Sequence, residues 1–204
     1  MEIDRKKHWE TVYETKQPDE VSWTQENPKT SLDFIRETHL SKTAKIIDIG
    51  GGDSKLVDFL LEEGYQDITV LDISEKALKR AQKRLGKNAE KINWIVSDIT
   101  EFKPETGYDI WHDRATFHFL TTAEQVEKYV KIVEKQVTSF LIIGTFSDQG
   151  PKKCSGLDIK QYSGSELENQ FSNRFKKIKC ITEDHVTPFE TKQNFTFCVF
   201  EKTN

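Results

Sequence analysis

Short apolar runs alternate with amphipathic segments along most of the chain, from about residue 43 onward. Apolar runs of about four to eight residues bounded by turn signals are typical of buried strands, whereas apolar positions three and four apart indicate helices. The pattern predicts strands at residues 44–49, 67–72, 92–96, 108–111 and 138–145. It predicts helices at residues 54–63, 74–85 and 122–134, the last two capped by Ser74 and Thr122.

The end of the chain breaks this alternation. One more helix is predicted to begin at Ser163, and two strands follow at residues 176–183 and 194–201, with a turn near Pro188 and no helix between them. Strands that alternate with helices form a parallel sheet buried on both faces. The sequence therefore predicts an α/β fold, a doubly wound seven-stranded sheet that ends in an antiparallel β-hairpin.

Residues 1–42 precede the first predicted strand and carry Trp9, Tyr13 and Trp23 among many charged side chains. Such a segment cannot form a core of its own. Ligands of open α/β folds bind outside the carboxyl ends of the strands. We therefore predict that residues 1–42 form a helical lid segment across that edge of one domain, which residues 43–204 build.

The composition narrows the class of protein. At 204 residues the chain is long enough for one large core, and its mean hydropathy of −0.66 favours a soluble protein. No apolar run approaches the roughly 18 residues that a membrane helix needs, and the charged N-terminus lacks the core of a signal peptide. A net charge of −4 argues against a broad nucleic-acid-binding face. We expect a cytoplasmic protein without membrane or nucleic-acid partners.

The cysteines Cys154, Cys180 and Cys198 have neither the number nor the spacing of a disulfide framework or a metal site. Reduced thiols and no metal are therefore expected. Cys180 and Cys198 fall within predicted strands. Cys154 lies in the loop at residues 147–157, which should overhang the ligand site, and we expect its thiol to be exposed there and to contact a substrate.

Three consecutive glycines, Gly50, Gly51 and Gly52, separate the first predicted strand from the following helix. Glycine permits a positive φ and lets a ligand come close to the backbone. A dinucleotide fingerprint that starts at Gly50 would need glycine at position 55, where this chain has Lys55, and the Gly-Lys-Ser/Thr ending of a phosphate loop is absent. Asp48 adds negative charge, which suits an ammonium better than a pyrophosphate.

Two further carboxylates end predicted strands. Asp72 lies 72 − 52 = 20 residues beyond Gly52, where doubly wound nucleotide sites place the carboxylate that binds the ribose. Asp98 follows the third strand and is suited to accept a hydrogen bond from an adenine amino group. Because parallel strands end at the same edge, Asp48, Asp72, Asp98 and the glycines should share one rim.

These motifs resemble those of the class I S-adenosylmethionine-dependent methyltransferases. The stretch IIDIGGGDS resembles the first motif of that superfamily, D-x-G-x-G-x-G, with Ser54 in place of the last glycine. VLDIS resembles the ribose-binding strand end, SDIT resembles the adenine-contacting loop, and the terminal hairpin fits the seventh strand of a Rossmann-like fold. The resemblance covers about residues 43–202.

The resemblance implies S-adenosyl-L-methionine as cofactor and S-adenosyl-L-homocysteine as product. Gly50 and Gly52 would approach the methionine part, Asp72 the ribose and Asp98 the adenine ring, with Ile73 beside that ring. The full set of expected cofactor contacts is Asp48, Gly50, Gly51, Gly52, Ser54, Asp72, Ile73, Asp98, Ile99 and Trp23.

The fourth predicted strand runs into WHDRATFHF, the densest cluster of polar and aromatic residues in the chain. His112, Asp113 and His118 are candidates for a base or for orienting the acceptor, and Arg114 is a candidate partner for a carboxylate of the cofactor or the acceptor. The alternative is that Trp111, Phe117 and Phe119 belong to the core while one of the histidines caps a helix.

Trp9, Tyr13 and Trp23 are candidates for an aromatic lid over the cofactor and for contacts with the acceptor. The segment that holds them resembles the N-terminal segment of small-molecule methyltransferases such as the thiopurine group, in which tryptophans line the site. Anchoring of an N-terminal helix is the alternative.

The leading hypothesis is methyl transfer to a small molecule by in-line displacement. A protein lysine methyltransferase is the first alternative, although HDRATFHF contains a basic residue and two histidines where such enzymes usually carry an acidic-aromatic motif. A catalytically inactive cofactor-binding subunit is the second alternative. The nucleophilic atom of the acceptor and the oligomeric state stay open at this stage.

Overall fold

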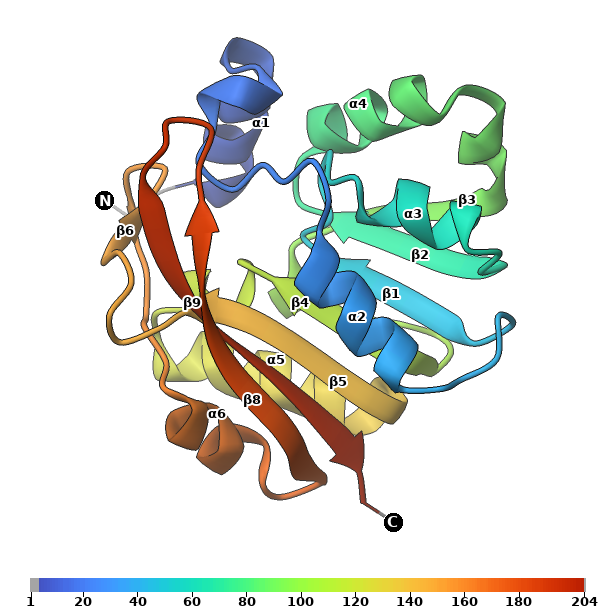
Figure 1. The fold of residues 1–204 in the computed structure, drawn as a ribbon, viewed down its shortest axis with the longest axis vertical. Coiled ribbons are helices and arrows are strands. Elements are labelled where there is room, and N and C mark those ends of the chain that lie inside the picture. Colours follow the sequence, from blue (N-terminus) through green and yellow to red (C-terminus); the bar gives the residue numbers. More distant parts are fainter. Residues whose placement is uncertain (1–3, 204) are drawn as a thin grey trace.

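A computed structural model describes residues 4–203, so the first three residues of the predicted lid segment lie outside the described part (Figure 1). The structure confirms the predicted fold class: seven strands form one mixed sheet in the order β3-β2-β1-β4-β5-β9-β8. The strands are β1 (Lys45–Ile49), β2 (Asp67–Asp72), β3 (Ile92–Val96), β4 (Tyr108–Arg114), β5 (Val137–Phe146), β8 (Phe175–Val186) and β9 (Lys192–Lys202). The helices are α1 (Arg5–Thr15), α2 (Lys29–Glu37), α3 (Leu56–Glu62), α4 (Glu75–Leu85), α5 (Ala123–Gln136) and α6 (Gly164–Phe171).

The first five strands are parallel, and the terminal hairpin pairs antiparallel, β9 with β5 and β8 with β9. Two differences from the sequence prediction bear on the site. The strand β4 continues to Arg114 instead of ending at Trp111, and a short hairpin of β6 (Lys153–Cys154) and β7 (Leu157–Asp158) interrupts the loop after β5.

Each face of the sheet carries its own hydrophobic core. On one face, aromatic and aliphatic residues of α5 and α6, such as Tyr129 and Phe171, pack against Trp111 of β4. On the other face, residues of α2 and α3, such as Leu32 and Leu60, pack against β1 and β9. Figure 1 shows α2 and α3 in front of the sheet and α5 behind it. Side chains that alternate along β4 therefore enter two different environments.

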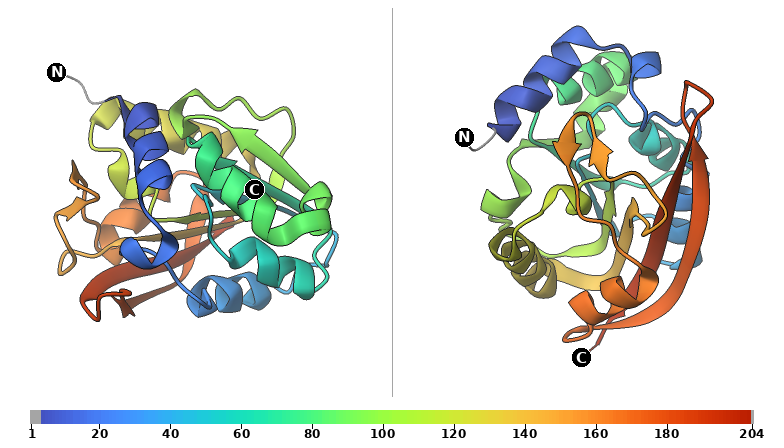
Figure 2. Two further views of the ribbon diagram at one scale, coloured as in Figure 1. Left: turned by 90° about the horizontal axis from the view of Figure 1, so that it is seen from above. Right: turned by 90° about the vertical axis from the view of Figure 1, so that its left-hand side faces the viewer.

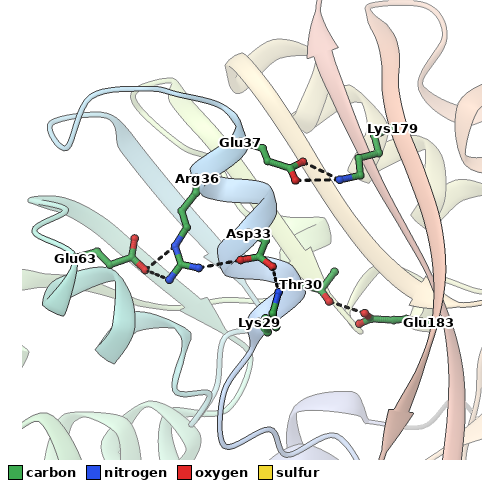
Figure 3. A network of polar contacts seen from close by, with 8 residues as sticks. All are labelled: Lys29, Thr30, Asp33, Arg36, Glu37, Glu63, Lys179 and Glu183. Atoms are coloured by element: carbon green, nitrogen blue, oxygen red, sulfur yellow. Dashed lines mark hydrogen bonds and ion pairs between the residues drawn. The ribbon is translucent and has the colours of Figure 1, made fainter.

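The helix α2 is part of the core, since its residues Leu32, Phe34 and Ile35 are almost fully buried. Polar contacts on both flanks hold it in place (Figure 3). On one flank, Arg36 pairs with Glu63 just after α3, with 3.1 Å between Nε and Oε1. On the other flank, Lys179 of β8 donates to Glu37 at 3.0 Å, and the hydroxyl of Thr30 donates to Glu183 of β8.

The helix α1 lies beside α4 (Figure 2). Arg80 of α4 donates to the carbonyl oxygens of Tyr13 and Lys16, and the N–H of Glu75 donates to Glu10 Oε1 at 2.7 Å. The chain between α1 and α2 therefore crosses the ends of the central strands.

Two expectations about cysteines were wrong. Cys180 and Cys198 form a disulfide that joins β8 to β9, because the register of the hairpin sets them directly opposite one another. Cys154 is buried, with 5% of its surface exposed, because the β6–β7 hairpin turns its side chain inward. Within residues 4–203, none of the helices is long and apolar enough to cross a membrane.

Candidate functional site

The glycine loop after β1 has a backbone that only glycine accommodates easily. Gly50 and Gly52 have φ values of +64° and +50°. A Cβ atom at Gly50 would lie 1.8 Å from Thr116 Oγ1, and one at Gly52 would lie 2.6 Å from the hydroxyl oxygen of Tyr13. The N–H of Gly51 donates to the carbonyl oxygen of Leu71 in β2 at 3.2 Å, which fixes the loop against the sheet. The loop is thus held close to its neighbours on every side.

A cavity of about 380 Å³ opens at the carboxyl ends of β1, β2 and β4. Most of the predicted site residues line it: Trp9, Tyr13, Trp23, Asp48, Gly50, Gly51, Ser54, Asp72, Ile73, Asp98, Ile99, His112, Arg114 and Cys154. Gly52, Asp113 and His118 are not among its lining residues. The predicted rim of strand-end carboxylates and the predicted aromatic residues therefore meet in one cavity.

The carboxylates at the strand ends are held by backbone N–H groups. Asp72 Oδ1 accepts from the N–H of Ser74 at 2.8 Å, and Asp98 Oδ1 accepts from the N–H and the hydroxyl of Thr100, both at 2.8 Å. Burial, with a smaller contribution from the nearby charges of Asp53 and Asp48, raises the pKa of Asp72 to about 7. Asp72 is thus a buried carboxylate that titrates near neutral pH.

His112 sits between two other buried polar side chains. Its Nδ1 lies 2.7 Å from Asp48 Oδ1, and its Nε2 lies 2.8 Å from Ser31 Oγ of α2. Both ring nitrogens are therefore engaged inside the protein, although the residue lines the cavity. Asp48, which the sequence suggested would suit an ammonium group, lines the cavity and pairs through Oδ1 with this imidazole.

Asp113 was predicted as a catalytic candidate, and the structure places it elsewhere. Its side chain points to the α5 face of the sheet, where Oδ1 accepts from the N–H groups of Thr116 at 3.0 Å and Phe117 at 3.1 Å. Its Oδ2 accepts from the hydroxyl of Tyr129 at 2.7 Å. This carboxylate is fully buried and supports the turn after β4, so its role is structural.

His118 is likewise buried away from the cavity. It belongs to the 3-10 helix η4 (Phe117–Phe119) and stacks on Phe146 at 4.6 Å between ring centroids. Burial and the charge of Arg114 lower its pKa to about 3, so the ring is neutral at physiological pH. The prediction of His118 as a base is wrong because its ring fills the core.

Aromatic rings cover the cavity from the N-terminal side. The Trp9 ring lies 5.6 Å from Trp23 and 5.2 Å from Phe119 between centroids, with both pairs edge to face. Arg5 donates from Nη2 to the carbonyl oxygen of Phe119 at 2.7 Å, which ties α1 to the turn after β4. The predicted aromatic residues thus form one cluster with Phe119.

Arg114 and Cys154 lie at the β5 and β9 side of the cavity. Arg114 Nη1 donates to the carbonyl oxygen of Trp23 at 3.0 Å, and its guanidinium lies 4.8 Å from the ring centre of Phe195. Burial raises the pKa of Cys154 to about 12, so its side chain is a neutral thiol. Within residues 4–203, no group of three His, Cys, Asp or Glu side chains is arranged to hold a metal ion.

The sequence prediction missed several cavity residues: Arg5, Ser31, Leu71, Thr116 and Phe119. Ser31 carries no signal in the sequence, because a single serine in an amphipathic helix is usually exposed. Phe119 belonged to a recognised cluster, but only the turn after β4 decides which of its aromatic residues reach the cavity.

Comparisons with known proteins agree with this geometry. Residues 46–136 match the family described as "Methyltransferase domain". The eEF1A lysine and N-terminal methyltransferase of Bos taurus is 24% identical over 131 residues, 64% of this chain and 18% of that protein. Malonyl-(acyl-carrier protein) O-methyltransferase 2 of Ilyobacter polytropus is 30% identical over 88 residues, 43% of this chain and 33% of that protein. This chain thus spans less than a fifth of the bovine relative.

A solved structure shares the whole fold. N-methyltransferase NodS from Bradyrhizobium japonicum WM9, in complex with S-adenosyl-L-homocysteine, superposes with a TM-score of 0.72 at 15% identity. The superposition covers 96% of this chain and 98% of that one. At this level of identity the likeness shows the fold.

Proposed function

Because this chain belongs to the class I S-adenosylmethionine-dependent methyltransferase superfamily, we propose that it transfers a methyl group from S-adenosyl-L-methionine to a small-molecule acceptor. One observation supports a small molecule as the acceptor. The cavity that contains the strand-end carboxylates also contains Arg114 and Cys154, and the chain between α1 and α2 covers it with Trp23. A cofactor and a small acceptor would share this enclosed space.

The residues of the cavity fit the cofactor. Gly50 and Gly51 line it without side chains, and Asp72 stands at the end of β2, where its carboxylate would accept hydrogen bonds from ribose hydroxyls. Asp98 and Ile99 would contact the adenine ring. The proposed division into a lid segment, residues 1–42, and a catalytic domain, residues 43–204, assigns Trp9, Tyr13 and Trp23 to the cover of this site.

The cofactor supplies a methyl group that its sulfonium charge already activates. The protein mainly has to align the acceptor and exclude water. We assign water exclusion to Trp9, Trp23 and Phe119, whose rings pack together over the cavity. His112, with both ring nitrogens engaged, is assigned a positioning role, because its ring links Ser31 of α2 to Asp48 of β1.

A protein lysine acceptor is the second candidate. Lysine methyltransferases of eEF1A recur among the relatives, which favours it. The two candidates differ in product, which S-adenosyl-L-methionine labelled in its methyl group would reveal. Transfer to a lysine-containing peptide would give labelled methyl-lysine on acid hydrolysis, whereas transfer to small acceptors would leave the peptide unlabelled. Methyl-lysine formed at a rate above that with any small acceptor would contradict our proposal.

Asp72→Ala is expected to weaken the binding of S-adenosyl-L-homocysteine about 30-fold, because two charge-assisted hydrogen bonds to the ribose are lost. Isothermal titration calorimetry measures this directly. Asp67→Ala, at the exposed opposite end of the same strand, is the matched control and should bind like the wild type. If the well-folded wild type bound neither S-adenosyl-L-methionine nor S-adenosyl-L-homocysteine, the proposed function would be wrong.

The same binding should depend on pH through Asp72. Its pKa of about 7 leaves most of the carboxyl groups protonated at pH 6, whereas the ribose hydroxyls need the ionised form as acceptor. Affinity for S-adenosyl-L-homocysteine should therefore rise about tenfold between pH 6 and pH 8. In Asp72→Asn the calorimetric profile should be weaker and flat over this range; an equally steep profile would assign the dependence to another group.

A further inference from the structure

Arg114 lines the cavity with part of its guanidinium group lacking a partner. Its Nη1 is engaged by the carbonyl oxygen of Trp23, while Nε and Nη2 are shielded from solvent and make no hydrogen bond. Nε and Nη2 form one edge of the guanidinium plane, and their two N–H bonds point in parallel. This is the edge that binds both oxygens of a carboxylate at once.

The protein itself does not neutralise this charge with an ion pair. Burial lowers the pKa of Arg114 to about 10, which still leaves it positive at neutral pH. Glu183 and Asp48 are close enough to favour the charge, but Glu183 accepts from the hydroxyl of Thr30 (Figure 3), and Asp48 pairs with His112. Within the described residues, no carboxylate lies within ion-pairing distance of this guanidinium.

The other titratable neighbours do not supply an anion either. Cys154 is held as a neutral thiol, and the charge of Arg114 helps to lower the pKa of His118 and His185. A guanidinium that is shielded from solvent and has two N–H groups without partners is costly in free energy unless an anion binds to it. Resting on the methyltransferase function proposed above, we propose that Arg114 binds a carboxylate group of the methyl acceptor.

Position in the sheet assigns this carboxylate to the acceptor. Asp72 and Asp98, which we assign to the ribose and the adenine, follow β2 and β3, on one side of β1. Arg114 ends β4 on the other side, and its guanidinium packs on Phe195 of β9. The residues assigned to the nucleoside and Arg114 thus lie on opposite sides of the glycine loop that follows β1.

The other features of the cavity indicate the charge and the body of the acid that Arg114 would bind. The single unpartnered guanidinium fork matches one negative charge, so a monoanion fits it better than a dianion such as a phosphate monoester. The rings of Trp9, Trp23 and Phe119 favour an apolar or aromatic body. Because pairing with Arg114 withdraws electron density from both carboxylate oxygens, the carboxylate serves recognition and another atom of the acceptor receives the methyl group.

Matched pairs of acid and amide test this assignment. Phenylacetate and benzoate, against phenylacetamide and benzamide, are titrated into the protein saturated with S-adenosyl-L-homocysteine, with calorimetry and tryptophan fluorescence as readouts. We expect at least one acid to bind about tenfold or more tightly than its amide, equivalent to roughly 1.4 kcal/mol or more. Arg114→Gln should abolish that preference, and Arg114→Lys should keep part of it.

Arg36→Gln is the matched control, since Arg36 lies on the outer face of α2 and pairs with Asp33 and Glu63 (Figure 3). It should retain the full preference for the acid. Equal affinity for acid and amide, no binding of either acid, or a preference that survives in Arg114→Gln would each overturn the inference.

A parallel titration separates the acceptor from the cofactor. If Arg114→Gln lowered the affinity for S-adenosyl-L-homocysteine but not for 5′-methylthioadenosine, which lacks the amino-acid part, Arg114 would bind the cofactor carboxylate. That result would overturn the inference and leave the proposed function intact. Failure of the wild type to bind S-adenosyl-L-homocysteine would instead overturn the proposed function, and this inference with it.

Discussion

Replacing Asp113 by alanine is expected to lower the free energy of unfolding by about 3 kcal/mol, without removing any group that lines the cavity. The carboxylate accepts hydrogen bonds from the N–H groups of Thr116 and Phe117 and from the hydroxyl of Tyr129. Alanine would leave these three donors without an acceptor in the protein interior. The hydroxyl of Tyr129 also accepts from Trp111 Nε1 at 3.0 Å, so the loss would loosen a connected network.

Urea unfolding followed by circular dichroism measures this loss as a lower midpoint with an unchanged slope. Asp113→Asn is the matched variant, because its amide oxygen still accepts from the two backbone N–H groups, and it should lose only about 1 kcal/mol. It should also bind S-adenosyl-L-homocysteine like the wild type. An Asp113→Asn protein of normal stability that binds cofactor but transfers no methyl group would restore Asp113 as a catalytic residue.

Asp113 was assigned to the site because the sequence did not show where the fourth strand ends. The pattern predicted that the fourth strand ends at Trp111, which left residues 112–118 as one undivided cluster. In the structure β4 continues to Arg114, so the side chains of His112 and Arg114 face the cavity while that of Asp113 faces α5. Both faces of a central parallel strand are buried, so hydrophobicity alone does not tell which face a polar residue joins.

Other parts of the site were readable because they depend on local geometry. Each carboxylate that ends a strand reaches the carboxyl edge once the βαβ order is known, so Asp72 and Asp98 were placed correctly on the cavity wall. The contact of Ser31 with His112 depends on how α2 docks, which the chain before β1 does not reveal. The disulfide of Cys180 and Cys198 depends on the register of the terminal hairpin, which includes an irregularity between Lys177 and Lys179.

Gly50→Ala is expected to weaken binding of S-adenosyl-L-homocysteine about 100-fold, equivalent to roughly 2.8 kcal/mol, and to destabilise the fold as well. The φ of +64° places the residue in the left-handed region, which costs about 1–2 kcal/mol for a residue with a Cβ. That Cβ would lie 1.8 Å from Thr116 Oγ1 and 3.0 Å from Thr116 Cβ, so the turn after β4 and the glycine loop must move apart. Both segments line the cavity, and the movement would displace the backbone that the cofactor contacts.

Gly64→Ala separates the two causes, because Gly64 also has a positive φ, +86°, but a Cβ there meets no atom within 4 Å. This control at the end of α3 should lose only about 1 kcal/mol of stability and bind S-adenosyl-L-homocysteine with unchanged affinity. The double variant Gly50→Ala/Thr116→Ala removes the closest contact and should recover part of the binding in calorimetry. Wild-type affinity in Gly50→Ala would mean that the cofactor does not depend on this loop, and the assignment of the glycines would then be wrong.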